Sequence, residues 1–215
     1  MVTVNGHFAP PTDPEYVRTD AGLSRLRVLV VDDHPAVRLG LSQLLDDQPD
    51  LVVTSVASSA EEARSLAERE PIDVAVVDYQ LGSRSGLWLT RMLKRLEPAP
   101  SVVIYSAYCD GPLAAACVVA GADGLVSKGG VGNELCHAVR AVARGSSRLP
   151  TVPVALAGAM RRRLAPEEQA IFGMLLAGIA PSEVADTLGI TGRELDTRRW
   201  SMLPKLEGLR RLDAC

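Results

Sequence analysis

Aromatic residues, paired cysteines and an excess of positive charge are all scarce in this chain of 215 residues. Phe, Trp and Tyr together make up 4% of the residues and hydrophobic residues 47%, so a core must be built from aliphatic side chains. The formal net charge of −3 gives no overall indication of binding to nucleic acid or to an anionic membrane. The length fits one large domain or two small ones.

The cysteines and histidines lack the spacing of a disulfide framework or a metal site. None of the four cysteines stands in a Cys-x-x-Cys pair, which predicts free thiols in a reducing compartment. The three histidines are scattered, which argues against a histidine-ligated metal. No apolar run approaches the length of a membrane span, and residues 1–24 lack the charged start and apolar middle of a signal peptide. We therefore expect a cytoplasmic protein with a flexible leader at residues 1–24.

Short valine-rich runs alternate with longer amphipathic segments from residue 25 onward. The runs lie at residues 28–31, 51–56, 74–77, 102–105 and 124–127. Each is apolar on consecutive positions, as in strands buried on both faces of a sheet. The helix-like segments between them lie at residues 35–47, 59–70, 86–97, 112–120 and 131–144. This alternation predicts a doubly wound α/β domain over residues 25–147, with five parallel strands and a site at their carboxyl ends.

The pattern changes after residue 147. Residues 148–163 contain two prolines and no strand pattern, so we expect a linker that holds a short helix at 154–160. Residues 164–215 then predict a small all-α domain. Its expected helices lie at residues 166–178, 182–188 and 192–203, with Gly178 and Gly189 as C-terminal stops.

Polar side chains follow four of the five predicted strands. Asp32 and Asp33 follow the first, Asp78 the third, Ser106 the fourth and Lys128 the fifth. Because the carboxyl ends of parallel strands share one edge, we expect these side chains to converge. Three carboxylates repel one another unless a cation joins them, and their hard oxygen ligands suit Mg²⁺. Each residue alone could be a cap or a turn residue, but together they favour a site that holds a phosphoryl group on a carboxylate.

Four segments resemble the receiver domain of two-component response regulators. They are VLVVDDHPAVRLGL (28–41), DVAVVDYQLGSRSG (73–86), VVIYSAY (102–108) and AGADGLVSK (120–128). The DDHP motif resembles the NarL/FixJ family in particular. The resemblance covers residues 26–145 and implies a flavodoxin-like fold. It also implies that a sensor histidine kinase is a partner of the protein. It implies Asp78 as the phosphoacceptor, with Ser106 and Lys128 beside the phosphoryl group. The Mg²⁺ ligands that it implies are Asp32, Asp33, Asp78 and the carbonyl of Gln80.

Residues 164–206 resemble the LuxR-type helix-turn-helix. The similarity includes L-x-P-x-E at its start and GIAPSEVADTLGIT through the turn. It implies that residues 183–188 form the supporting helix and that residues 192–203 lie in the major groove of promoter DNA. The implied DNA contacts are Arg193, Thr197, Arg198, Arg199 and Lys205. A helical module for protein contacts is the alternative.

Several residues depart from the family patterns. Leu125 stands where the family usually has an aromatic residue that rotates inward on activation, and Gly82 stands where it usually has proline. Asp196 and Trp200 occupy positions that are often basic, and an acid that faces DNA phosphates weakens binding. Pro204 is expected to end or kink its helix.

The leading hypothesis is therefore a transcription regulator that a histidine kinase phosphorylates on Asp78, acting as a homodimer whose formation responds to phosphorylation. The alternative is an atypical regulator that acts through dimerisation or protein partners, largely independently of phosphorylation. We expect no enzymatic turnover. A Mg²⁺-dependent phosphatase would carry a second acid two residues after the nucleophile, where this chain has Gln80.

Overall fold

The computed structural model of the chain describes residues 25–130 and 132–207. The predicted leader at residues 1–24 and the C-terminal segment 208–215 lie outside the described residues. Within the described part of the chain, no helix is both long and apolar enough to cross a membrane. Cys136 is a buried free thiol, as predicted.

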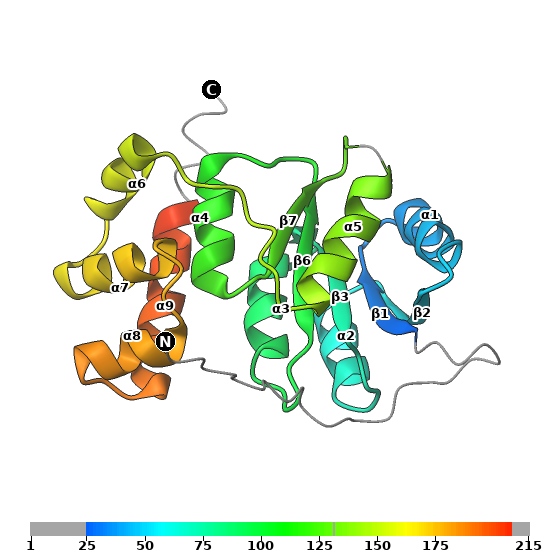
Figure 1. Cartoon of the computed structure of the whole chain (residues 1–215), viewed down its shortest axis with the longest axis horizontal. Coiled ribbons are helices and arrows are strands. Elements are labelled where there is room, and N and C mark those ends of the chain that lie inside the picture. Colours follow the sequence, from blue (N-terminus) through cyan, green and yellow to red (C-terminus); the bar gives the residue numbers. More distant parts are fainter. Residues whose placement is uncertain (1–24, 131, 208–215) are drawn as a thin grey trace, which may run out of the picture.

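A parallel sheet forms the centre of the N-terminal region, with strand order β2-β1-β3-β6-β7 (Figure 1). Its strands are β1 (Leu26–Val31), β2 (Leu51–Ala57), β3 (Val74–Asp78), β6 (Ser101–Ser106) and β7 (Gly124–Ser127). The helices between them are α1 (Pro35–Asp46), α2 (Ala60–Ala67), α3 (Gly86–Leu93), α4 (Gly111–Ala120) and α5 (Gly132–Ala143). The predicted five-stranded parallel α/β fold is confirmed.

Alternate residues of the central strands fill two cores, one on each face of the sheet. Val28 and Val30 of β1 pack in the core that contains buried leucines of α1 and α5. Leu29 and Val31 face the other core, with buried residues of α2, α3 and α4. Both faces are therefore covered, which explains why the strands are apolar on consecutive positions.

A short hairpin that the sequence did not predict follows β3. Strand β4 (Gln80–Leu81) pairs antiparallel with β5 (Arg84–Ser85), and Gly82 in the turn between them has a φ of 56°. Only two residues pair on each side, so no run of alternating residues marks these strands in the sequence.

The C-terminal region is helical, as predicted. Its helices are α6 (Val154–Arg161), α7 (Pro166–Leu176), α8 (Pro181–Leu188) and α9 (Gly192–Glu207). Pro204 was predicted to end or kink α9, and it does not end the helix, which continues through this proline to Glu207. Leu203 and Leu206 are buried on either side of the proline, and their packing holds the last turn.

Helix α9 lies alongside α4, so the C-terminal helices pack directly on the α/β region (Figure 1). The α4 sequence GPLAAACVVA is apolar around its whole circumference, and eight of its ten residues are buried. A helix that is apolar on all sides must be covered on all sides. The sheet covers one side of α4, and α9 together with α6 and α7 covers the other.

Candidate functional site

Two carboxylates and a lysine meet at the carboxyl ends of the central strands. Asp32 directly follows β1 and is fully buried, and Asp78 is the last residue of β3 with 6% exposure. The Lys128 Nζ atom, which follows β7, lies 2.6 Å from Asp32 Oδ2 and 2.9 Å from Asp78 Oδ2. The structure thus brings these three predicted site residues into direct contact, and the lysine bridges the two acids.

Asp33 lies beside this group and contacts a histidine that the sequence analysis did not assign to the site. His34 Nδ1 lies 2.7 Å from Asp33 Oδ1, and the His34 backbone N–H donates to Asp32 Oδ1 at 2.8 Å. Ligand atoms of Asp32, Asp33, His34 and Asp78 all lie within 4.8 Å of one another. The three carboxylates form a compact set of hard oxygen donors, which fits a small divalent cation such as Mg²⁺.

The protonation equilibria of Asp78 and Lys128 are displaced by their shared environment. Burial raises the pKa of the Asp78 carboxyl, and the nearby Asp32 carboxylate adds to this, while Lys128 opposes it. Burial lowers the pKa of Lys128, but its hydrogen bonds to Asp32 and Asp78 outweigh burial and leave that pKa raised. The two directions are compatible, because burial outweighs the attraction of a single lysine at Asp78, whereas the attraction of two carboxylates outweighs burial at Lys128. A lysine held in its charged form suits an incoming phosphoryl group.

Ser106 lies on β6, which pairs with the strand of Asp78, and Leu125 lies on β7, one strand further out. Ser106 is the last residue of β6 and is 1% exposed, and its Oγ accepts a hydrogen bond from the Tyr108 N–H at 3.1 Å. The Ser106 carbonyl accepts from the Lys128 N–H at 2.7 Å, which joins the ends of β6 and β7. Leu125 is buried in β7 with 6% exposure and therefore serves as an aliphatic core residue.

Gly86 allows α3 to begin directly against the candidate phosphoacceptor. A Cβ atom at this position would lie 2.2 Å from the Asp78 carbonyl oxygen, so any side chain would force the backbone apart. The Gly86 N–H donates to the Tyr79 carbonyl at 2.7 Å, and the Ser85 hydroxyl caps the helix by accepting from the Trp88 N–H. Gly86 was not among the predicted site residues, although it ends the receiver-like segment at residues 73–86.

The residues predicted to contact DNA lie on different faces of α9. Arg193, Thr197 and Lys205 are exposed, and their spacing of four and eight residues places them on one side of the helix. Arg198 pairs with Glu194 at 2.6 Å on the same helix. Arg198 is only partly exposed, and the Lys205 Nζ atom lies 2.7 Å from Oε2 of Glu168 on α7.

Arg199, by contrast, turns toward α4. Its Nε donates to the Val119 carbonyl at 2.8 Å, and burial lowers the pKa of its guanidinium. Arg199 therefore faces α4, unlike the predicted DNA contacts Arg193, Thr197 and Lys205, which are exposed.

Asp196 and Trp200 also face the α/β region. Asp196 accepts hydrogen bonds from Arg91 of α3 and from Arg95 in the turn after α3, with Arg91 Nη2 at 2.9 Å from Asp196 Oδ2. The Arg91 guanidinium stacks on the Trp200 ring at 4.7 Å from its centroid. Burial raises the pKa of Asp196, but its bonds to the two arginines outweigh burial and leave that pKa lowered. Both residues that depart from the helix-turn-helix pattern therefore contact α3 in this arrangement.

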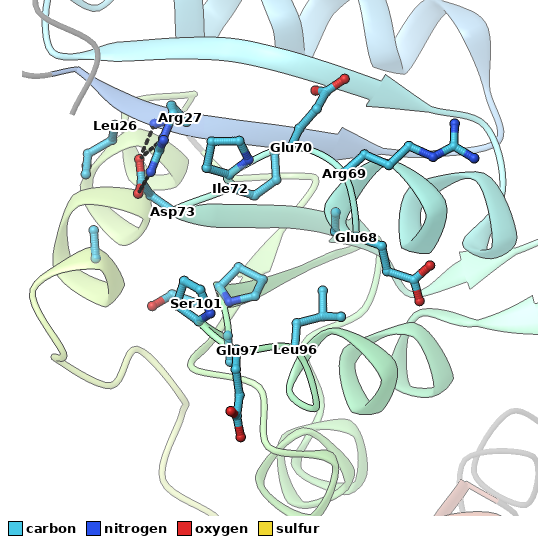
Figure 2. Close-up of a pocket in the computed structure, with 16 residues that line it drawn as sticks. Leu26, Arg27, Glu68, Arg69, Glu70, Ile72, Asp73, Leu96, Glu97 and Ser101 are labelled. Carbon is cyan, nitrogen blue, oxygen red and sulfur yellow. Dashed lines mark hydrogen bonds and ion pairs between the residues drawn. The ribbon is translucent and has the colours of Figure 1, made fainter. Parts of the chain in front are cut away.

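A separate pocket of about 490 Å³ lies at the opposite, amino-terminal edge of the sheet (Figure 2). Inside it, Arg27 donates to both carboxylate oxygens of Asp73, through Nε at 3.1 Å and Nη2 at 2.9 Å. This ion pair joins the start of β1 to the segment before β3. None of the predicted site residues lines this pocket, so it carries none of the predicted chemistry.

Comparison with known proteins supports the resemblance to a response regulator. The family model for the response regulator receiver domain matches residues 28–140. The chain is 32% identical to the DNA-binding transcriptional activator DevR/DosR of Mycobacterium tuberculosis, over 88% of this chain and 92% of that protein. It is 31% identical to the transcriptional regulatory protein UhpA of Salmonella typhimurium, over 84% of this chain and 91% of that protein.

Solved structures agree. A LuxR-family two-component response regulator from Aurantimonas sp. SI85-9A1 matches with a TM-score of 0.56 and 30% identity, over 65% of this chain and 99% of that chain. RcsB from Salmonella enterica serovar Typhimurium, bound to promoter rprA, has a similar fold, with a TM-score of 0.56 and 19% identity over 85% of this chain and 93% of that chain. The chain belongs to the response regulator family and is of the NarL/FixJ type.

Proposed function

We propose that this chain is a DNA-binding transcription regulator controlled by phosphorylation of Asp78. The proposed organisation is a receiver domain at residues 25–147, a linker at 148–163 and a LuxR-type helix-turn-helix domain at 164–215. The observation that carries the proposal is the Lys128 ammonium, which lies within 2.9 Å of Asp78 and 2.6 Å of Asp32. The cationic group thus stands where a phosphoryl group on Asp78 would need its charge balanced.

The proposed chemistry is phosphoryl transfer from a sensor histidine kinase to the Asp78 carboxylate. An Asp78 oxygen attacks the phosphorus of the phosphohistidine, so that a P–O bond forms while the P–N bond breaks and the histidine leaves. Mg²⁺, when bound by Asp32, Asp33, Asp78 and the Gln80 carbonyl, supplies positive charge for the phosphoryl oxygens. Lys128 and the Ser106 hydroxyl would contact the same oxygens from the adjacent strand ends.

The proposed DNA contacts are the exposed residues of α9 together with Arg199. Helices α8 and α9 would form the helix-turn-helix, with Arg193, Thr197, Arg198 and Lys205 reaching phosphates or base edges. Arg199 bonds the Val119 carbonyl of α4, so it reaches DNA only after α9 leaves the receiver. DNA binding and docking of α9 on α4 therefore compete.

Relatives supply the remaining proposals. DevR/DosR is a DNA-binding transcriptional activator, and one related structure contains two RcsB dimers bound to two parallel DNAs. By analogy, we propose that this chain acts on promoter DNA as a homodimer, in the cytoplasm, and that it does not turn over a substrate as an enzyme.

The proposed function is tested by phosphate labelling and DNA retention. A small phosphodonor such as acetyl phosphate should label the wild-type chain in the presence of Mg²⁺, and the label should be absent from Asp78→Asn. Salt-dependent retention of a promoter fragment should be lost in Arg198→Ala. If the wild-type chain takes up no label, the proposed function is wrong.

A second candidate function rests on Leu125. Because this buried leucine cannot rotate as an aromatic residue would, the receiver could act mainly as a docking or dimerisation surface. In that case, Asp78→Asn would bind DNA and dimerise as the phosphorylated wild-type chain does.

A further inference from the structure

Tyr79, the residue directly after Asp78, contacts the last turn of α9. Its hydroxyl donates to Glu207 Oε1 at 3.2 Å across 128 positions of sequence. Its main chain is held on both sides, since its N–H donates to the Tyr105 carbonyl and its own carbonyl accepts from Gly86. The side chain that adjoins the proposed phosphoacceptor thus reaches the end of the proposed recognition helix.

The other end of α9 is anchored to the same segment of the receiver. Asp196 binds Arg91 of α3 and Arg95 in the turn that follows α3. The first residue of α3, Gly86, is hydrogen-bonded to the Tyr79 carbonyl. Both anchors therefore depend on the stretch of chain that begins immediately after Asp78.

Glu207 is stabilised in the docked arrangement by a bond that it would lose on undocking. A carboxylate in the last turn of a helix faces the negative end of the helix dipole, which disfavours it. The Tyr79 hydroxyl provides a hydrogen bond to this carboxylate only while α9 lies against the receiver. Additional negative charge next to Tyr79 would destabilise the same contact.

We propose that Tyr79 transmits phosphorylation of Asp78 to α9 through Glu207, in a chain where the usual aromatic position holds Leu125. This inference rests on the proposed function. Phosphorylation replaces the single negative charge of the ionised Asp78 carboxylate with the roughly two charges of a phosphoryl group, so about one negative charge is added next to Tyr79. Repulsion between these charges and the Glu207 carboxylate weakens the Tyr79–Glu207 contact, and α9 is released from α4.

Trp200 provides a native reporter for the release. The chain contains two tryptophans, so Trp88→Phe leaves Trp200 as the single tryptophan, whose emission can be excited selectively. The Trp200 ring lies under the Arg91 guanidinium, and undocking should move it into water and shift its emission to longer wavelength. All variants below carry Trp88→Phe, and each is measured with and without acetyl phosphate and Mg²⁺, alongside phosphate incorporation.

Two substitutions separate the hydrogen bond from the charge. Tyr79→Phe removes only the hydroxyl. Without the phosphodonor, the ratio of docked to undocked α9 should therefore fall about fivefold. The shift in Trp200 emission on adding the phosphodonor should also become smaller. Glu207→Gln keeps an oxygen that accepts from Tyr79 but removes the charge, so docking at rest should persist while the response falls. Glu183→Gln, an exposed acid on α8, is the matched control and should respond as the wild-type chain does.

The outcomes distinguish this inference from the proposed function. If the wild-type chain takes up no label, both are overturned. If it is labelled, and if Tyr79→Phe and Glu207→Gln are labelled and respond like the control, the role of Tyr79 is overturned while the proposed function stands. The inference is supported if Tyr79→Phe shows the emission of undocked Trp200 already without the phosphodonor, and if Glu207→Gln shows a smaller emission shift than the control when the phosphodonor is added.

Discussion

Asp196 of α9 forms an ion pair with Arg91 of α3, with 2.9 Å between Oδ2 and Nη2. This acid was expected to face DNA and to repel its phosphates. Docked on the receiver, it instead anchors the helix, and Arg91 also stacks on Trp200. One departure from the family pattern thus has a defined structural partner 105 positions away in the sequence.

Removal of Arg91 should favour DNA binding. Arg91→Ala deletes the ion pair with Asp196 and the stacking on Trp200, which together stabilise docking by about 1–2 kcal/mol. Retention on a random-sequence duplex should therefore increase about tenfold without phosphorylation. Because the change also removes a positive charge, stronger DNA binding cannot come from electrostatic attraction.

Arg84→Ala is the matched control for that experiment. Arg84 also stacks on a tryptophan, Trp88, at 4.9 Å from the ring centroid, but its ion pair is with Glu61 of α2. Equal DNA retention in Arg91→Ala and Arg84→Ala would contradict the anchoring role of Arg91.

Gly86→Ala should destabilise the receiver near Asp78. The added Cβ would lie 2.2 Å from the Asp78 carbonyl oxygen. We expect a loss of about 2–3 kcal/mol in the free energy of unfolding, measured by urea denaturation. Gly40→Ala in α1 is the control, because a Cβ there meets no atom within 4 Å and alanine favours a helix. An equal effect of both substitutions would show that the close approach at Gly86 is tolerated.

Mg²⁺ should stabilise the wild-type chain through the acidic group. Binding to the folded state alone raises the free energy of unfolding by about 2.7 kcal/mol at a hundredfold excess over Kd. The melting temperature should therefore rise with added Mg²⁺, and the rise should be reduced in Asp33→Asn. Asp186→Asn, an exposed change on α8, should respond as the wild-type chain does. A rise of the same size in Asp33→Asn would exclude Asp33 as a ligand.

Asp78→Asn should stabilise the metal-free protein at neutral pH. Burial raises the pKa of Asp78 above the ordinary value of 3.8, so the folded chain holds this proton more tightly than the unfolded chain. The stabilising contribution of Asp78 is thus present below that value and is lost as the pH rises through the raised pKa. In urea denaturation, Asp78→Asn should therefore be more stable than wild type near pH 7, and this gain should disappear on acidification. A pH-independent difference would contradict this assignment.

The sequence predicted the parallel sheet and the group at its carboxyl edge, because both follow from local patterns. Valine runs mark buried strands, and the residues after them must share one edge. The docking of α9 could not be predicted in the same way, since the contacts of Asp196 and Arg199 join segments far apart in the chain. One signal was available: α4 is apolar on every side, which requires a cover on its outer face.

Phosphate incorporation at Asp78 tests the central claim most directly. The full chain is incubated with acetyl phosphate, with or without Mg²⁺, and its intact mass is measured together with that of Asp78→Asn. We expect one phosphoryl group on the wild-type chain, only with Mg²⁺, and none on Asp78→Asn. A wild-type chain that remains unmodified, or an Asp78→Asn chain that is modified equally, would contradict the account.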